Sequence, residues 1–225
     1  MKLAEFRGAY PADRAAALSG VPRSTIHYWA RHSILVPSLS PSKVKLWSYT
    51  DLMGLRTIHW LRQRKITSFG WDIPPSTMPA VRHALSVLRE LDLEPWTAEA
   101  GPAVFVDAKG EIYVETHAGP ETARSGLRPL NRELLNLVEP FTTHSAKGPN
   151  LHSPRPNLRI LPGKLSGEPH IVHTRIETSA VAALALRGFD TDQLARLYPT
   201  AEPLAIAEAI DLERQLDQNL RAAAA

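Results

Sequence analysis

A cluster of polar side chains near the N-terminus is the part of this chain best suited to bind a partner. Four such residues open a helix that is predicted from residue 21 onward: Arg23, Ser24, Thr25 and His27. Guanidinium, hydroxyl and imidazole groups on the first turns of a helix can form hydrogen bonds with base edges in the major groove of DNA. Tyr28 and Arg31 follow on the next turn, where side chains reach phosphates. The spacing predicts a DNA-reading helix.

A second candidate cluster lies shortly after that helix. Polar and apolar residues alternate from residue 43 to 49, which is the pattern of a short strand, and the candidate contacts in it are Lys43, Lys45 and Trp47. A strand of this kind fits a wing beside the DNA backbone, where lysines supply salt-dependent affinity. In the competing interpretation, the aromatic residues Trp29, Trp47 and Tyr49 pack in the core and the cations only solvate the surface. For Trp29 we prefer the core, since it shares a face with Ile26.

The elements that position these clusters have clear boundary signals. Tyr10-Pro11 opens a helix through Leu18, Ser19-Gly20 ends it, and the reading helix follows after a short turn. After the wing, Thr50 is the expected N-cap of a third helix that ends near Lys65. Helix, turn, helix, wing, helix is the order of a winged helix-turn-helix domain, which we place at residues 1–92.

The charge distribution agrees with this placement. The chain has 225 residues, 26 Lys and Arg, 23 Asp and Glu, and a net charge of +3. Residues 1–70 carry a net charge of +8, whereas residues 71–150 carry −4 and residues 151–225 carry −1. A basic surplus confined to one third of a chain is typical of a nucleic-acid-binding module joined to other modules, although a solvated basic face remains the alternative.

The rest of the sequence predicts two further modules. An amphipathic helix carries Val81, Leu85, Leu88 and Leu91. In a central region, 93–138, we expect a β-hairpin from Ala103–Val106 and Glu111–Glu115 and a helix over Leu130–Val138. Residues 139–157 are rich in Pro, Ser, Asn and Gly and are the expected linker.

The C-terminal module, 158–225, is predicted to contain a two-stranded ribbon and three helices. The strands are Leu158–Leu161 and His170–His173, and the helices begin at the expected caps Thr178 and Thr191 and at Glu202-Pro203. The predicted fold class is therefore mainly α with small β elements (α+β): an N-terminal winged helix-turn-helix, a central β-hairpin, and a C-terminal β-ribbon with a three-helix module.

Several function classes are disfavoured by the composition. The chain has no Cys, which excludes disulfides, a thiolate nucleophile and zinc or iron-sulfur sites built on sulfur ligands. His170 and His173 would point to opposite faces of a strand, so no metal or other cofactor is expected. No catalytic motif is present, and we expect a protein that is not an enzyme. The longest apolar run is far too short to span a membrane, so we expect no membrane role. The absence of Cys fits a reducing cytoplasm, which is the expected location.

Two segments resemble known families. The sequence Gly20-Val21-Pro22-Arg23-Ser24-Thr25-Ile26-His27-Tyr28-Trp29, with Lys45 to Tyr49 and Asp51-Leu52, resembles the winged helix-turn-helix of MerR-like regulators. The segment Gly163 to Ile176, with Arg187-Gly188, Tyr198-Pro199 and Ala209 to Glu213, looks like the small C-terminal domain of many VapB-type antitoxins. His173 stands where that pattern often has glycine.

Together the resemblances imply an antitoxin of a type II toxin-antitoxin pair. Such a protein would bind operator DNA at its own promoter as an autorepressor and neutralise a PIN-type ribonuclease toxin by direct contact. The apolar stripe Ile206, Ile210, Leu216 and Leu220 would contact the toxin where it is not core, and the arginines that would approach the toxin's carboxylates are Arg175, Arg214 and Arg221.

Other interpretations stay open at this level. The alternative is a free-standing MerR-like transcriptional regulator whose C-terminal module binds a ligand or a protein, and a nucleic-acid enzyme is a weaker third. One reading helix per chain covers few base pairs, so a homodimer is expected in the first two cases.

Overall fold

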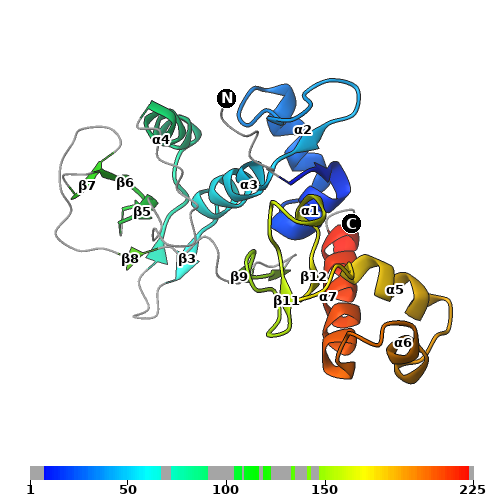
Figure 1. The fold of residues 1–225 in the computed structure, drawn as a ribbon. Coiled ribbons are helices and arrows are strands. Elements are labelled where there is room, and N and C mark those ends of the chain that lie inside the picture. The colour runs from blue at the N-terminus through cyan, green and yellow to red at the C-terminus, as the bar shows by residue number, and fades with distance from the viewer. Residues whose placement is uncertain are drawn as a thin grey trace, which may run out of the picture. The chain divides into compact units, whose positions relative to one another are not determined.

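The structure is a computed structural model, and it describes residues 8–66, 72–90, 104–107, 109–116, 119–122, 133–134, 141–142 and 147–222. The chain divides into two compact units. The first unit comprises residues 1–52 and 138–225, and the second comprises residues 53–137. Helix α3 (Tyr49–Leu61) runs from one into the other. Helices and small antiparallel sheets make up the described part (Figure 1), which confirms the α+β class.

The helix-turn-helix lies in the first unit. Helices α1 (Ala12–Ser19) and α2 (Arg23–Arg31) are joined at Gly20, whose φ of 72° is left-handed and whose amide donates to the Ala16 carbonyl. Glycine adopts this conformation without the steric cost that other residues incur. On the inner side of α2, Ile26 and Trp29 are buried, as the helical spacing predicts.

The wing is shorter than the sequence pattern predicts. Strand β2 covers only Leu46–Trp47 and pairs with β1 (Tyr10–Pro11). Leu46 also exchanges both backbone hydrogen bonds with Ser40, at 3.0 and 3.2 Å, which closes residues 41–45 into a tight loop. The expected strand to Tyr49 is wrong at its end, because Ser48 and Tyr49 already belong to the start of α3.

Helix α3 is capped by Ser48 and not by Thr50. The Ser48 hydroxyl accepts from the Asp51 amide at 3.1 Å, and the Asp51 carboxylate accepts from the Ser48 amide at 2.8 Å. This reciprocal pair is a capping box in which aspartate takes the usual place of glutamate. The helix ends at Leu61, before the predicted Lys65, since Lys65 already lies in a strand.

The second unit continues from α3. It contains strands β3 (Lys65–Ile66) and β4 (Asp72–Ile73), which pair with each other, and the amphipathic helix α4 (Met78–Glu90). Its sheet has the order β7-β6-β5-β8, and the strand bounds are Val104–Val106 for β5, Ile112–Thr116 for β6, Gly119–Thr122 for β7 and Glu133–Leu134 for β8.

Pairing of β5 with β6 confirms the predicted hairpin. Asp107 closes its turn by accepting from the Lys109 and Glu111 amides at 2.8 and 2.9 Å. The helix expected over Leu130–Val138 is wrong where the structure describes it, since Glu133 and Leu134 pair with β5. Sheet pairing outweighs the helical spacing of the leucines there.

The C-terminal part of the first unit has the predicted ribbon and helices. Strands β11 (Leu158–Arg159) and β12 (His170–Ile171) pair, a short 3₁₀ helix η1 (Leu165–Gly167) lies between them, and the pair β9 (Phe141–Thr142) and β10 (Lys147–Gly148) precedes them. The three helices are α5 (Thr178–Leu186), α6 (Thr191–Leu197) and α7 (Pro203–Ala222). Figure 1 shows α7 beside α1, with which it packs.

Two of the expected caps are displaced by one residue. Glu177 is the N-cap of α5, and Thr178 instead donates its backbone amide to the Pro169 carbonyl at 2.9 Å. Asp190 caps α6 through a capping box with Gln193. In both cases a carboxylate residue precedes the predicted threonine and takes the cap position.

Part of the range predicted as a linker is tied to neighbouring elements. Leu151 is fully buried, and its carbonyl accepts from the Tyr49 hydroxyl at 3.0 Å. Arg155 pairs with Asp211 of α7 at 2.8 Å. The predicted domain ranges themselves stay a prediction, because the compactness of a unit does not show which ranges fold independently.

Candidate nucleic-acid interface

The outer face of α2 carries the predicted reading residues. Arg23, Ser24, Tyr28 and Arg31 are exposed, and Thr25 and His27 are partly exposed. Since Ile26 and Trp29 anchor the opposite side in the core, the helix presents its polar side chains to solvent in one row. Pro22, the N-cap residue, forms no side-chain hydrogen bond with the first-turn amides, and such amides at a helix start favour phosphate groups. The geometry suits insertion of α2 into a groove.

The electrostatic environment of this face is positive. Burial lowers the pKa of His27, and the nearby charges of Arg23, Lys45 and Arg31 lower it further. Three cations from α2 and from the wing therefore act on one imidazole. His27 stays neutral near pH 7 and can donate or accept a hydrogen bond at a base edge.

Two contacts hold side chains of this face in place. Asp13 of α1 pairs with Arg23 at 2.8 Å, and both side chains are more than half exposed. The ring of Tyr28 lies 4.2 Å from the ring of His32, measured between centroids. The sequence interpretation did not include Asp13 or His32. Asp13 stands in the first turn of α1, and nothing in its spacing indicates that it reaches α2.

The tip of the wing presents two predicted contacts. Lys43 is exposed, Lys45 is partly exposed, and Val44 between them is 68% exposed. Asp51 fixes the base of this loop, since its carboxylate accepts from the Ser38 amide at 2.9 Å, the Ser38 hydroxyl at 2.8 Å and the Ser48 amide. Asp51 is itself only 6% exposed. A buried carboxylate with this number of donors makes the position of the loop well defined.

Trp47 does not lie on this surface. Its side chain is fully buried, and its ring meets the His27 ring edge-on with centroids 6.1 Å apart. The indole therefore has no exposed atom for the predicted DNA contact, and it matches the alternative of core packing. Trp47 is therefore not a candidate DNA contact, and its ring instead packs against the ring of His27.

The predicted toxin-binding residues are placed unevenly. Ile206 and Leu216 of the apolar stripe are core residues, and Ile210 and Leu220 are partly buried, so half of the stripe belongs to the core of the unit. Arg221 is exposed and pairs with Asp217 one turn earlier at 2.6 Å. Arg175 and Arg214 are exposed, and neither has an acidic partner within the described part of the chain.

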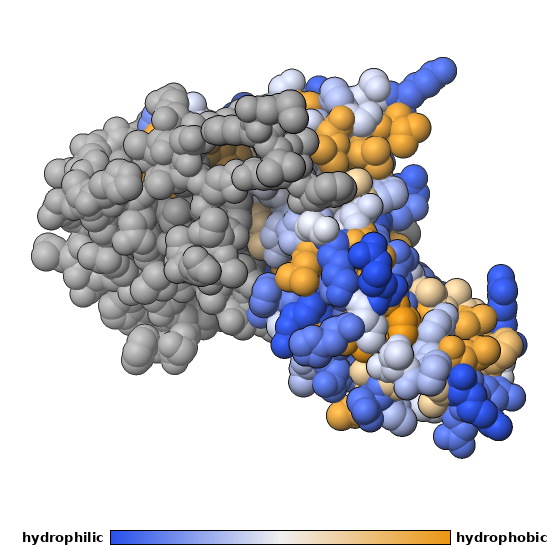
Figure 2. All heavy atoms as spheres, viewed as in Figure 1, coloured by the Kyte–Doolittle hydropathy of each residue, from blue (hydrophilic) through white to orange (hydrophobic). Residues whose placement is uncertain are grey.

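Apolar side chains are exposed elsewhere in the C-terminal module. Leu186, at the end of α5, is 90% exposed, and it is accompanied by Phe189 at 38%, Leu197 at 53% and Leu204 at 65%. Figure 2 shows apolar surface over these helices, at the lower right, and a second area near the loop after α2. Sequence periodicity did not single out these four residues, because three lie at helix ends and Phe189 lies between α5 and α6, where a stripe has no continuation.

The described residues offer no metal-binding cluster of three or more His, Asp or Glu side chains. Among the described helices, none is long and apolar enough to cross a bilayer. The second unit contains a pocket of about 630 Å³ between the start of α4 and the β5–β6 turn. Its polar lining residues include Ser76, Thr77, His83, Lys109 and Glu111.

Two family models match parts of the chain. Residues 10–68 match the family model described as MerR HTH family regulatory protein. Residues 159–211 match a family described as protein of unknown function (DUF433). No curated protein and no solved structure matches the chain. The chain thus carries a MerR-family helix-turn-helix domain, and this type of domain supports a role in DNA binding.

Proposed function

We propose that this protein is an operator-binding regulator that inserts α2 into the major groove and places its wing along the DNA backbone. The observation that carries the proposal is the row of exposed polar residues on α2 beside Lys45, within a match to a MerR-type domain. In this arrangement Arg23 and His27 read bases, while Arg31 and Lys43 contact phosphates. The protein acts by binding and not by catalysis.

We further propose that the regulator is the antitoxin of a toxin-antitoxin pair and neutralises a PIN-type ribonuclease. Support comes from the resemblance of residues 163–213 to the C-terminal domain of VapB-type antitoxins and from the exposed apolar side chains of that module. Since Ile206 and Leu216 are core residues, the contact surface in this proposal is Leu186, Phe189, Leu197 and Leu204. Arg175 and Arg214 are available for acidic groups of the toxin.

DNA binding is tested with the full chain and a fragment of its own promoter. Replacing Lys43 and Lys45 with Ala removes phosphate contacts, so affinity falls for all sequences and the slope of log K against log salt becomes shallower by about one to two. Replacing Arg23 with Ala relaxes preference at one base position, by about 10- to 100-fold. Arg82→Ala, an exposed arginine of α4, is the matched control and leaves affinity unchanged. Wild-type protein that binds promoter and random DNA equally would contradict the proposal.

The antitoxin role is tested by co-expression with a neighbouring nuclease gene. Full-length protein is expected to co-purify with the nuclease and restore growth. Leu197→Ser and Leu204→Ser are expected to reduce co-purification while DNA binding persists, because both side chains lie in the C-terminal module. If the protein binds its promoter but has no effect on the nuclease, the antitoxin proposal is contradicted and the regulator proposal is retained.

We also propose a homodimer, since each chain has one reading helix and paired half-sites lengthen the recognised sequence. Sedimentation at micromolar concentration, with and without operator DNA, measures this directly. A monomer in both conditions would contradict it.

The free-standing regulator remains the second candidate. The pocket at the start of α4 would give such a regulator a site for its effector, since it has the size of small-molecule sites. This places the effector in the second unit and not in the C-terminal module, where the sequence interpretation had it. An effector that shifts operator affinity, in a genome without an adjacent nuclease gene, would decide for this candidate.

A further inference from the structure

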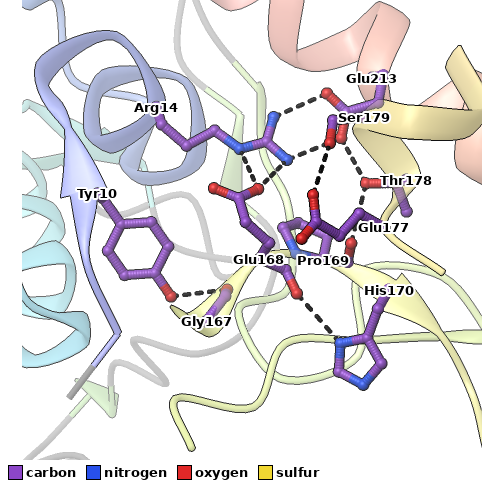
Figure 3. A network of polar contacts seen from close by, with 10 residues as sticks. All are labelled: Tyr10, Arg14, Gly167, Glu168, Pro169, His170, Glu177, Thr178, Ser179 and Glu213. Atoms are coloured by element: carbon purple, nitrogen blue, oxygen red, sulfur yellow. Dashed lines mark hydrogen bonds and ion pairs between the residues drawn. The ribbon is translucent and has the colours of Figure 1, made fainter. Parts of the chain in front are cut away.

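A buried ion cluster joins the helix-turn-helix to the C-terminal module (Figure 3). Arg14 of α1 donates two hydrogen bonds to the carboxylate of Glu213 in α7, at 2.7 and 2.8 Å, and one to Glu168 at 2.8 Å. The three side chains are only 14–20% exposed. Burial opposes the charge of Arg14, but Glu213 and Glu168 outweigh this effect and raise the pKa of its guanidinium. Thr178 donates to the same Glu213 carboxylate.

Two further contacts join the same parts. The Tyr10 hydroxyl donates to the Gly167 carbonyl at 2.8 Å, and Tyr10 is fully buried. A Cβ at Gly167 would lie 2.1 Å from the Tyr10 oxygen, so only glycine permits this approach, and its φ of +83° also favours glycine. Asn219 of α7 donates to the Ala17 carbonyl of α1 at 3.1 Å. Tyr10, Arg14 and Ala17 therefore each form a hydrogen bond with the C-terminal module. We call this set of hydrogen bonds the joint.

Two series of contacts connect the joint with predicted reading residues. Asp13 is the sequence neighbour of Arg14, about 100° around α1, and it pairs with Arg23 at the start of α2. Tyr10 pairs with Trp47 across β1 and β2, and the Trp47 ring supports His27. The hydrogen bonds to Glu213 and Gly167 thus fix the elements that carry Asp13, which pairs with Arg23, and Tyr10, whose strand carries the neighbour of Trp47.

We propose that Arg14 and Tyr10 are positioning residues for operator recognition: they lock α1 and β1 to the C-terminal module, which fixes the reading side chains of α2. In this role the C-terminal module contributes to DNA recognition, because it fixes the position of α2. The proposal rests on the DNA-binding function proposed above, and it is independent of whether the partner is a toxin.

The test compares Arg14→Met and Tyr10→Phe with Val181→Ala in the full chain. Val181 is fully buried in α5 of the same module and its side chain forms no hydrogen bond, so its truncation lowers stability and removes none of the hydrogen bonds of the joint. Binding to operator and to random DNA is measured over a salt range, at a temperature at which all variants are folded. Neither Arg14 nor Tyr10 is exposed enough to contact phosphate, so the salt slope stays constant.

The expected result is a loss of operator preference in the joint variants. For Arg14→Met the ratio of operator to random affinity falls about 10-fold, with random binding and salt slope unchanged. For Tyr10→Phe it falls about 3-fold, and Arg14→Lys, which keeps the charge but not the two-pronged contact, lies between Arg14→Met and wild type. Val181→Ala keeps the wild-type ratio.

Two other outcomes of the binding experiment have different meanings. If Arg14→Met keeps the wild-type ratio, or if Val181→Ala loses it equally, the positioning role is refuted and the cluster serves stability alone. If the wild-type protein itself shows no operator preference, the proposed function fails first, and hydrogen exchange still tests the joint. Faster exchange of α2 amides is expected in Arg14→Met and not in Val181→Ala, and equal rates would overturn the inference.

Discussion

Replacing Arg14 with Met is expected to destabilise the first unit in a pH-dependent way. The change leaves Glu168 and Glu213 facing each other without their shared cation. The side chain of Glu168 is 20% exposed and that of Glu213 is 14% exposed. Removing one member of a buried ion pair costs about 3–5 kcal/mol. Because water still reaches this cluster, we expect the lower end, about 3 kcal/mol.

The pH dependence follows from Glu168. Burial raises its pKa, and the charge and hydrogen bond of Arg14 work against this rise. A carboxyl whose pKa is higher in the folded state than in the unfolded state favours folding at low pH, and this contribution is lost as the pH rises through the folded-state value. Without Arg14 the rise is larger, so the window extends further towards neutral pH.

The measurement is thermal and urea unfolding of the full chain at pH 5.0 and pH 7.5. At pH 7.5 a loss of about 3 kcal/mol corresponds to a midpoint about 6–12 °C lower, if about 2–4 °C accompany each kcal/mol at this chain length. At pH 5.0 the gap between variant and wild type narrows, since protonation of Glu168 relieves the repulsion. Glu213→Gln is the control, because it removes one carboxylate and leaves Arg14 paired with Glu168.

Two results would refute this reasoning. A gap that is equal or wider at pH 5.0 would show that the carboxylates left behind are not the source of the cost. A loss below about 1 kcal/mol at pH 7.5 would show that the cluster behaves as an exposed ion pair.

Three further predictions concern the wing, a turn and the exposed apolar surface. Asp51→Ala leaves the buried Ser48 amide and the exposed Ser38 amide and hydroxyl without their acceptor, so we expect a loss of about 1–3 kcal/mol in urea unfolding and faster proteolysis of the wing loop, whereas unchanged cleavage would argue against its anchoring role. His173→Gly relieves a left-handed residue with φ of 59°, and the net gain of about 0.5–1 kcal/mol appears as a higher unfolding midpoint, which a lower midpoint would disprove. Leu186→Ser changes stability by less than about 0.5 kcal/mol because the side chain is 90% exposed, and a larger loss would mean that it is packed.

Local sequence signals predicted most of the elements that carry the candidate site. Tyr10-Pro11 at the start of the first helix, Ser19-Gly20 at its end, and the shared face of Ile26 and Trp29 on the reading helix were all visible in the sequence. These signals work because caps, tight turns and helical faces depend on residues within about four positions of each other. The reading row on α2 follows from the same periodicity.

Long-range contacts decided the rest. Arg14 meets partners 154 and 199 residues away, and no pattern in the chain marks that pairing. Periodicity shows which residues share a face, but it does not show what covers that face. For this reason Trp47 and the stripe of Ile206 and Leu216 turned out to be core, while Leu186 at a helix end is exposed. Tertiary packing alone determines which side chains remain available to a partner.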